Sequence, residues 1–137
     1  MFRLAKITGK GRGLLASEAI AAGTVIERAP VVRLGAEDRS LVDRTALFAY
    51  TFVDPEAFAA GTGADEPAPA GGHDCLLAFG NLTFCNHSEQ PNAVVRWTAD
   101  DIGLWASLEA LRSIEGGEEI TLYYTNISEY TAADFFI

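Results

Sequence analysis

The sequence has little of what several classes of protein require. Two cysteines, Cys75 and Cys85, are too few for a disulfide framework. No apolar run approaches the roughly 18 to 20 residues that span a bilayer, and the N-terminus lacks the apolar stretch and cleavage site of a secretory signal. These absences predict a cytoplasmic protein with reduced thiols and no membrane partner.

Basic residues are also scarce, with 10 Lys and Arg against 19 Asp and Glu. The net charge of −9 argues against direct nucleic-acid binding, which depends on clustered cations. No Lys or Arg lies between Arg44 and Arg96, and a second acidic stretch follows Arg112. These stretches favour an acidic surface that attracts a basic partner, although the same charge could serve solubility alone.

The length and composition are typical of one globular domain. The 137 residues allow a single core, and 49% of them are hydrophobic. Residues 54–74 are rich in Ala, Gly, Pro and acidic residues, which favours a solvated insertion loop over packed structure. We therefore expect one domain over 1–137 with a flexible acidic loop inside it.

Short apolar and β-branched segments predict a mostly β fold. Residues 14–16 and 24–28, separated by an Ala-Ala-Gly turn, predict a β-hairpin. Ser40 resembles a helix N-cap and precedes apolar residues at helical spacing, which predicts a short helix over 40–51. Further strands are predicted at 75–79, 93–97, 104–108 and 119–124.

Closely spaced glycines in Gly9-Lys10-Gly11-Arg12-Gly13 form the first candidate motif. Glycine lets the backbone approach a ligand that a Cβ would repel. The motif is neither a P-loop nor a dinucleotide-binding loop, because the residues that those motifs require do not follow it. A flexible turn remains the alternative.

A polar cluster over residues 84–92 forms the second candidate motif. Cys85 and His87 could suggest a nucleophile and its base, but no third orienting group accompanies them. The same pair with His73 and Cys75 could suggest zinc. Structural zinc sites favour two to four residues between paired ligands, whereas one separates Cys85 from His87, so we predict no metal site.

The third candidate motif is a glycine turn at Gly116-Gly117 that leads into a strand ending in two tyrosines. Strand alternation predicts that Tyr124 shares a face with Ile120 and Leu122, while Tyr123 lies on the opposite face. The two rings would then not share a role. Tyrosines at a strand end are also common as simple packing residues.

Taken in order, three segments together resemble the SET domain, over about residues 6–130 and closest to minimal bacterial and viral members. They are Gly11-Arg12-Gly13-Leu14, then Asn86-His87-Ser88 with Pro91-Asn92, then residues 117–124. The resemblance implies a β-clip fold of short sheets with one or two short helices and a pseudoknot, in which the segment bearing Asn86 and His87 threads beneath the chain leading to Tyr124. It also implies a protein lysine methyltransferase that uses S-adenosylmethionine.

The resemblance implies roles for individual residues. Tyr124 matches the catalytic tyrosine, between the cofactor on one face and a lysine channel on the other. The residues implied to bind the cofactor are Lys10, Gly11, Arg12, Gly13, Asn86, His87 and Tyr124. Leu122 is implied as a channel residue by its position two before Tyr124, and Tyr50 and Tyr130 by looser alignment, although both of these tyrosines could be core aromatics. The small Leu122 favours addition of more than one methyl group.

The resemblance further implies a basic protein or a lysine-containing tail, such as that of a histone, as partner, and a possible homodimer. The tail over 125–137 lacks the zinc-binding cysteines of many relatives, so Tyr130, Phe135 and Phe136 are candidates to cover the cofactor instead. Two alternatives stay open: a non-catalytic module that binds cofactor or basic peptide, and a purely structural β-rich interaction module.

Overall fold

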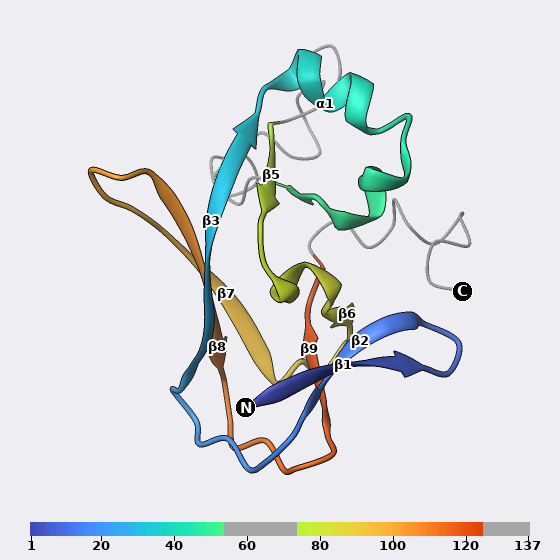
Figure 1. Ribbon diagram of the computed structural model, residues 1–137, viewed down its shortest axis with the longest axis vertical. Coiled ribbons are helices and arrows are strands. Elements are labelled where there is room, and N and C mark those ends of the chain that lie inside the picture. The colour runs from blue at the N-terminus through green and yellow to red at the C-terminus, as the bar shows by residue number, and fades with distance from the viewer. Residues whose placement is uncertain (54–73, 125–137) are drawn as a thin grey trace.

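The computed structural model describes residues 1–53 and 74–124 of the chain (Figure 1). Strands dominate this part of the chain, as the sequence predicts. The strands are β1 (Phe2–Ile7), β2 (Gly11–Ala16), β3 (Val25–Leu34), β4 (Phe52–Val53), β5 (Cys75–Ala78), β6 (Asn86–His87), β7 (Ala93–Ala99), β8 (Leu104–Ala110) and β9 (Glu119–Leu122). The helical elements are α1 (Ala36–Val42) and two short 3-10 helices, η1 (Ala46–Tyr50) and η2 (Asn81–Phe84).

The strands form two sheets that share one core. One sheet has the order β1-β2-β9-β6 and the other the order β4-β5-β3-β8-β7. Alternate residues of β8 are buried, which is the pattern of a strand with one face against a core. The core cluster includes residues of both sheets, so each sheet buries its apolar face against the other. Its most deeply buried members include Leu14, Leu82, Leu108, Ile114 and Ile120.

One parallel pairing occurs among the described strands, between β6 and β9. Asn86 lies opposite Thr121 and His87 opposite Leu122, and the Ser88 N–H donates to the Leu122 carbonyl at 2.8 Å. Antiparallel neighbours can be joined by a tight turn, but parallel strands need a long connection. This pairing therefore places the segment bearing Asn86 and His87 beside the chain leading to Tyr124, as the resemblance to the SET domain implies.

The predicted hairpin between residues 14–16 and 24–28 is wrong. Residues 14–16 belong to β2, which pairs with β1 and β9, whereas residues 25–28 belong to β3 in the other sheet. The chain between them is fixed by Ile20, which is buried and bridges Ile114. A segment with its own core anchor crosses between sheets instead of closing a tight turn.

The predicted helix over 40–51 is two shorter elements. Helix α1 begins earlier, with Gly35 as its N-cap, so Ser40 lies inside the helix. The Thr45 hydroxyl accepts the Leu47 N–H at 3.2 Å and starts η1, because threonine side chains compete for backbone donors. Among the described residues, no helix is long and apolar enough to cross a membrane.

The remaining predicted strands are confirmed as β5, β7, β8 and β9, with ends that differ by a few residues. Strand β9 stops at Leu122, two residues before the predicted end. The predicted insertion loop, except for its last residue Asp74, and the tail over 125–137 lie outside the described residues.

A buried asparagine fastens β9 to the chain that precedes β7. Asn92 is 1% exposed, its Oδ1 accepts the Thr121 N–H at 2.8 Å, and its Nδ2 donates to the Glu119 carbonyl at 2.7 Å. The same Nδ2 donates to Glu118, which also accepts a hydrogen bond from Arg112. These hydrogen bonds lower the pKa of the Glu118 carboxyl to about 2, and the bond from Arg112 has the largest effect.

Acid should therefore weaken the fold through Glu118. Its folded pKa of about 2 lies below the ordinary 4.5, so its contribution is complete above about pH 4.5 and is lost as the pH falls towards 2. The carboxylate is partly exposed, so we expect Glu118→Gln to lower the free energy of unfolding by only about 1 kcal/mol near neutral pH. Urea unfolding measures this difference.

The difference between Glu118→Gln and the native chain should shrink towards zero as the pH approaches 2. Glu115→Gln is the matched control, because Glu115 is an exposed acid of the same turn. A difference that is constant with pH would contradict the role of the ionised Glu118.

Candidate functional site

Two cavities lie on either side of Tyr124. The first, the polar cavity, has a volume of ≈ 360 Å³ and is lined by Lys6, Lys10, Gly11, Arg12, Ala49, Tyr50, Thr83, Phe84, Asn86 and Tyr124. The second, the apolar cavity, has a volume of ≈ 350 Å³. Its lining includes Phe52, Val95, Trp97, Leu122 and Tyr123. Four residues line both cavities and form their common wall: Ala49, Tyr50, Thr83 and Tyr124.

The polar cavity combines cations with aromatic rings. Lys10 lies in the β1–β2 turn and Arg12 near the start of β2, and Gly11 between them has a φ of 78° that only glycine adopts readily. The Arg12 guanidinium lies 4.6 Å from the centre of the Phe84 ring, and the Tyr50 ring meets Phe84 edge-on at 5.4 Å. This cavity can hold a ligand that carries both an anionic group and a flat ring.

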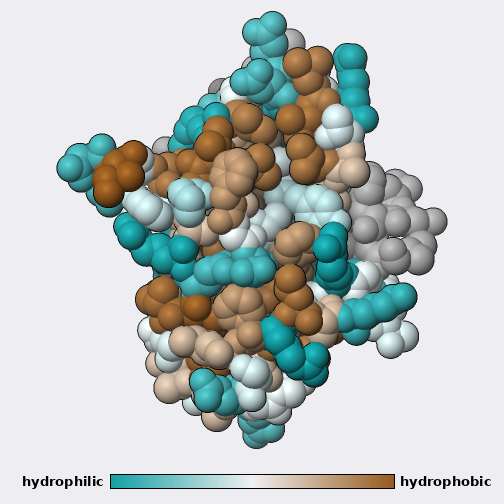
Figure 2. All heavy atoms as spheres, in the orientation of Figure 1, coloured by the Kyte–Doolittle hydropathy of each residue, from teal (hydrophilic) through white to brown (hydrophobic). Residues whose placement is uncertain are grey.

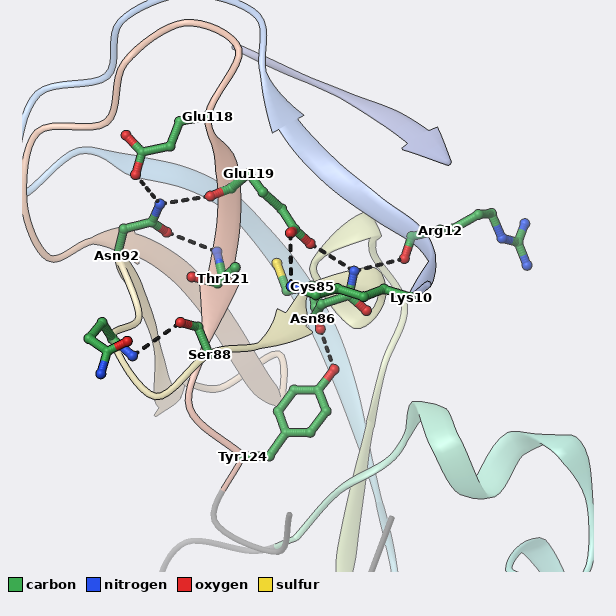
Figure 3. Close-up of polar contacts among 11 residues, drawn as sticks. Lys10, Arg12, Cys85, Asn86, Ser88, Asn92, Glu118, Glu119, Thr121 and Tyr124 are labelled. Atoms are coloured by element: carbon green, nitrogen blue, oxygen red, sulfur yellow. Dashed lines mark hydrogen bonds and ion pairs between the residues drawn. The ribbon is translucent and has the colours of Figure 1, made fainter. Parts of the chain in front are cut away.

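Glu119 organises the polar side chains beside this cavity (Figure 3). One of its carboxylate oxygens lies 3.3 Å from the Lys10 ammonium, and the other accepts a hydrogen bond from Asn86 Nδ2 at 2.8 Å. Asn86 is buried and also donates to the Arg12 carbonyl at 3.2 Å. Glu119 thus joins the first and second sequence motifs. Its role was not predicted from the sequence, although an acid at the start of a strand of buried residues is a usable signal.

Tyr124 is held at both ends by the segment that contains β6. Its hydroxyl donates a hydrogen bond to the Cys85 carbonyl (Figure 3). Its backbone N–H donates to His87 Nδ1 at 2.9 Å. The Tyr124 ring therefore has a fixed position in the wall between the cavities.

His87 supports the tyrosines and lines neither cavity. Its ring packs against those of Tyr123 and Tyr124, with ring centres 4.9 and 5.5 Å away. Because Nδ1 accepts the Tyr124 N–H, neutral His87 carries its proton on Nε2, which faces Glu89 at 3.3 Å. His87 thereby fixes the backbone that carries Tyr124.

The predicted faces of Tyr123 and Tyr124 agree with their burial, since Tyr124 packs against the core cluster that contains Ile120 and Leu122 whereas Tyr123 is 51% exposed, but both tyrosines line the apolar cavity. Alternation predicts opposite faces only while a strand continues, and β9 ends at Leu122. Of the other residues that the resemblance implies, Leu122 lines the apolar cavity and Tyr50 lines both cavities. Tyr130 lies outside the described residues.

Gly13 lines neither cavity and instead allows close packing. A Cβ at this position would lie 2.7 Å from Asn86 Nδ2, 2.8 Å from Ile7 Cγ1 and 2.9 Å from Glu119 Oε2. Side chains do not tolerate such distances, so glycine lets β2 approach the Asn86–Glu119 pair. Gly13 thereby supports the Asn86–Glu119 pair, and its expected contact with the cofactor stays a prediction.

The alternative chemistries of the second motif gain no support. Cys85 is 1% exposed, and burial, with the charges of Glu27 and Glu119, raises the pKa of its thiol, which suppresses the thiolate. Among the described residues, which exclude His73, no group of three His, Cys, Asp or Glu residues could hold a metal ion.

Comparisons with known proteins agree on one family. The sequence model of the SET domain matches residues 11–125. The H3 lysine-37-specific histone-lysine N-methyltransferase of Schizosaccharomyces pombe is 32% identical over 116 residues, which cover 84% of this chain and 67% of that protein.

Two solved structures have the same fold. A candidate histone methyltransferase from Plasmodium falciparum gives a TM-score of 0.66 at 22% identity, covering 92% of this chain and 98% of that one. The Neurospora SET domain protein DIM-5, a histone lysine methyltransferase, gives a TM-score of 0.62 at 20% identity, covering 91% of this chain and 52% of that one.

The packing around Gly13 predicts a cost for the smallest possible side chain. We expect Gly13→Ala to lower the free energy of unfolding by about 1 to 3 kcal/mol, because the added methyl overlaps Asn86 and Glu119. Gly116→Ala is the control, because its Cβ would make only ordinary contacts, at 3.4 Å or more, with Glu18. Equal unfolding midpoints for the two variants would contradict the tight packing.

Proposed function

This chain belongs to the SET domain family, and we propose that it is a protein-lysine N-methyltransferase that uses S-adenosylmethionine. The observation that carries the proposal is the meeting of two chemically different cavities at Tyr124. A methyl-transfer enzyme must bring a charged donor and an amine together in line, and the two reactants can enter from opposite sides of such a wall.

The residues of the polar cavity fit S-adenosylmethionine. Lys10 and Arg12 are suited to its carboxylate, and the rings of Phe84 and Tyr50 offer apolar surface to its adenine. The backbone around Gly11 can approach the ligand closely, and Asn86, which donates to the Arg12 carbonyl, would lie near the amino-acid end. When bound, S-adenosylmethionine supplies an electrophilic methyl group on a cationic sulfur.

The apolar cavity is suited to a lysine side chain. None of the described residues that line it is charged, and Phe52 and Trp97 form an edge-on pair within its wall. A lysine has an ordinary pKa of about 10.4 and must lose its proton before it attacks. An apolar wall disfavours the charged form and so lowers the lysine pKa, which increases the fraction of neutral amine.

Tyr124 is the proposed catalytic residue at the meeting point of the two cavities. Its hydroxyl hydrogen is directed to the Cys85 carbonyl, which leaves the oxygen lone pairs to accept from other donors. A polarised methyl group forms weak C–H···O contacts, and a lysine amine donates ordinary hydrogen bonds. Contacts of these two kinds with the Tyr124 oxygen would align the methyl group and the lysine amine without a metal.

The proposed substrate is a lysine of a basic protein. The net charge of −9 favours association with a cationic partner, and the Schizosaccharomyces pombe relative is named for a lysine of histone H3. Hydrophilic side chains are scattered over the face seen in Figure 2 and do not gather in one patch. Leu122 is smaller than an aromatic residue, so we propose that more than one methyl group can be added.

Cofactor binding and methyl transfer test the proposal directly. We expect S-adenosylmethionine to bind with measurable heat and to raise the unfolding temperature, because it binds only the folded chain. Radiolabelled methyl groups should then transfer to lysine in histones or other basic proteins of a cell lysate. No heat and no thermal shift would sink the proposal, whereas binding without transfer would favour a non-catalytic module.

The catalytic role of Tyr124 predicts a selective loss of turnover. We expect Tyr124→Phe to lower kcat by at least about tenfold, or about 1.4 kcal/mol of transition-state stabilisation, because the variant lacks only the hydroxyl. Cofactor affinity measured by calorimetry should change little. Tyr123→Phe is the comparison, because Tyr123 lines only the apolar cavity, so any effect of that variant should fall on the KM of the lysine substrate and not on kcat. Equal turnover in the native chain and Tyr124→Phe would remove this role.

A further inference from the structure

One carboxylate outside both cavities is bound to three N–H groups of η2. Glu27, a half-buried residue of β3, accepts the Leu82 backbone N–H at 2.7 Å on Oε1. Its Oε2 accepts the Asn81 backbone N–H at 3.2 Å and Asn81 Nδ2 at 3.0 Å. A single side chain from another part of the chain therefore holds the start of η2.

The hydrogen bonds replace a local cap that η2 does not have. The first N–H groups of a helix lack acceptors within it, and the side chain of the preceding residue usually accepts a hydrogen bond from one of them. Here that residue is Gly80, which has no side chain to do so. A Cβ on Gly80 would lie 2.7 Å from Ala29 Cβ and 2.9 Å from Glu27 Oε1, so glycine lets η2 approach β3 closely enough for Glu27 to serve.

The residues that follow this start form the wall around Tyr124. Thr83 lines both cavities, and Phe84 lines the polar cavity. The next residue, Cys85, presents the carbonyl that accepts the Tyr124 hydroxyl. Any shift of η2 would therefore move the acceptor that orients the catalytic hydroxyl.

We propose that Glu27 is a positioning residue for methyl transfer, acting through η2 and the Cys85 carbonyl on Tyr124. The inference rests on the proposed function for its effect on turnover. Glu27 lines neither cavity, and its hydrogen bonds to Asn81 and Leu82 are the contacts that would transmit its effect to η2.

Glu27→Gln tests this role with almost no change in volume. A glutamine has one acceptor oxygen and one NH₂ group, so one of its ends must face a backbone N–H without accepting it. We expect kcat to fall about tenfold while the Kd of S-adenosylmethionine changes less than about threefold. Glu37→Gln is the matched control, because Glu37 is exposed on α1.

A double-mutant cycle separates positioning from a general structural effect. If Glu27 acts through the Tyr124 hydroxyl, Glu27→Gln should cost much less turnover in a Tyr124→Phe background, where that hydroxyl is already absent. Losses that simply multiply in the double variant would overturn the inference.

A second readout does not depend on activity. The measurement is an NMR spectrum of protein with isotope-labelled tyrosine rings, in which the Tyr124 resonance is assigned by its loss in Tyr124→Phe. This resonance should shift in Glu27→Gln and stay in place in Glu37→Gln. An unmoved resonance would overturn the inference even if turnover fell. If the native chain transferred no methyl group, the proposed function would fail, and this resonance alone would decide whether Glu27 positions Tyr124.

A milder variant covers the case in which Glu27→Gln does not fold. Asn81→Ala removes one of the three hydrogen bonds and leaves both backbone bonds in place. We expect a smaller shift of the Tyr124 resonance in the same direction. No shift in this variant would overturn the inference.

Discussion

The parallel pairing of β6 with β9 is the constraint on which the rest of the site depends. It brings Asn86 beside a strand that begins 33 residues later, with Glu119. Bringing such distant segments together costs chain entropy, so other bonds must hold the pair. The buried Asn92 supplies three of them to residues 118–121, and the Tyr124 N–H and hydroxyl supply two more to β6 and its neighbour. Without this pairing, Tyr124 would have no fixed place and the two cavities no common wall.

Acidic side chains fasten this arrangement at several points. Glu27 holds η2 against β3, Glu118 joins Arg112 to Asn92, and Glu119 joins Lys10 to Asn86. In each case a carboxylate from one segment accepts N–H groups of another, which is a strong and directional contact. Part of the excess negative charge therefore has a structural task inside the fold. The remaining exposed acids are available for a basic partner.

The two cavities divide the proposed chemistry between them. The polar cavity has cations and flat rings, whereas the described lining of the apolar cavity has no charge. Separation allows each side to suit one reactant: charge pairing for the donor and desolvation for the lysine. Gly13 and His87 line neither cavity, yet both support the residues that do, by close packing and by a hydrogen bond to the Tyr124 backbone.

The sequence by itself determined the β-rich class, the strands β5, β7, β8 and β9, and the family, because periodicity and short ordered motifs are local properties. It failed at the predicted hairpin, because a strand's partner depends on distant residues; β2 pairs with β1 and β9. The roles of Glu27 and Glu119 could not be predicted, because the sequence does not distinguish a glutamate that is hydrogen-bonded inside the fold from a solvated one. Only the tertiary structure decided that the two cavities meet at Tyr124, because the Cys85 carbonyl and the His87 ring that hold this residue come from a segment distant in the sequence.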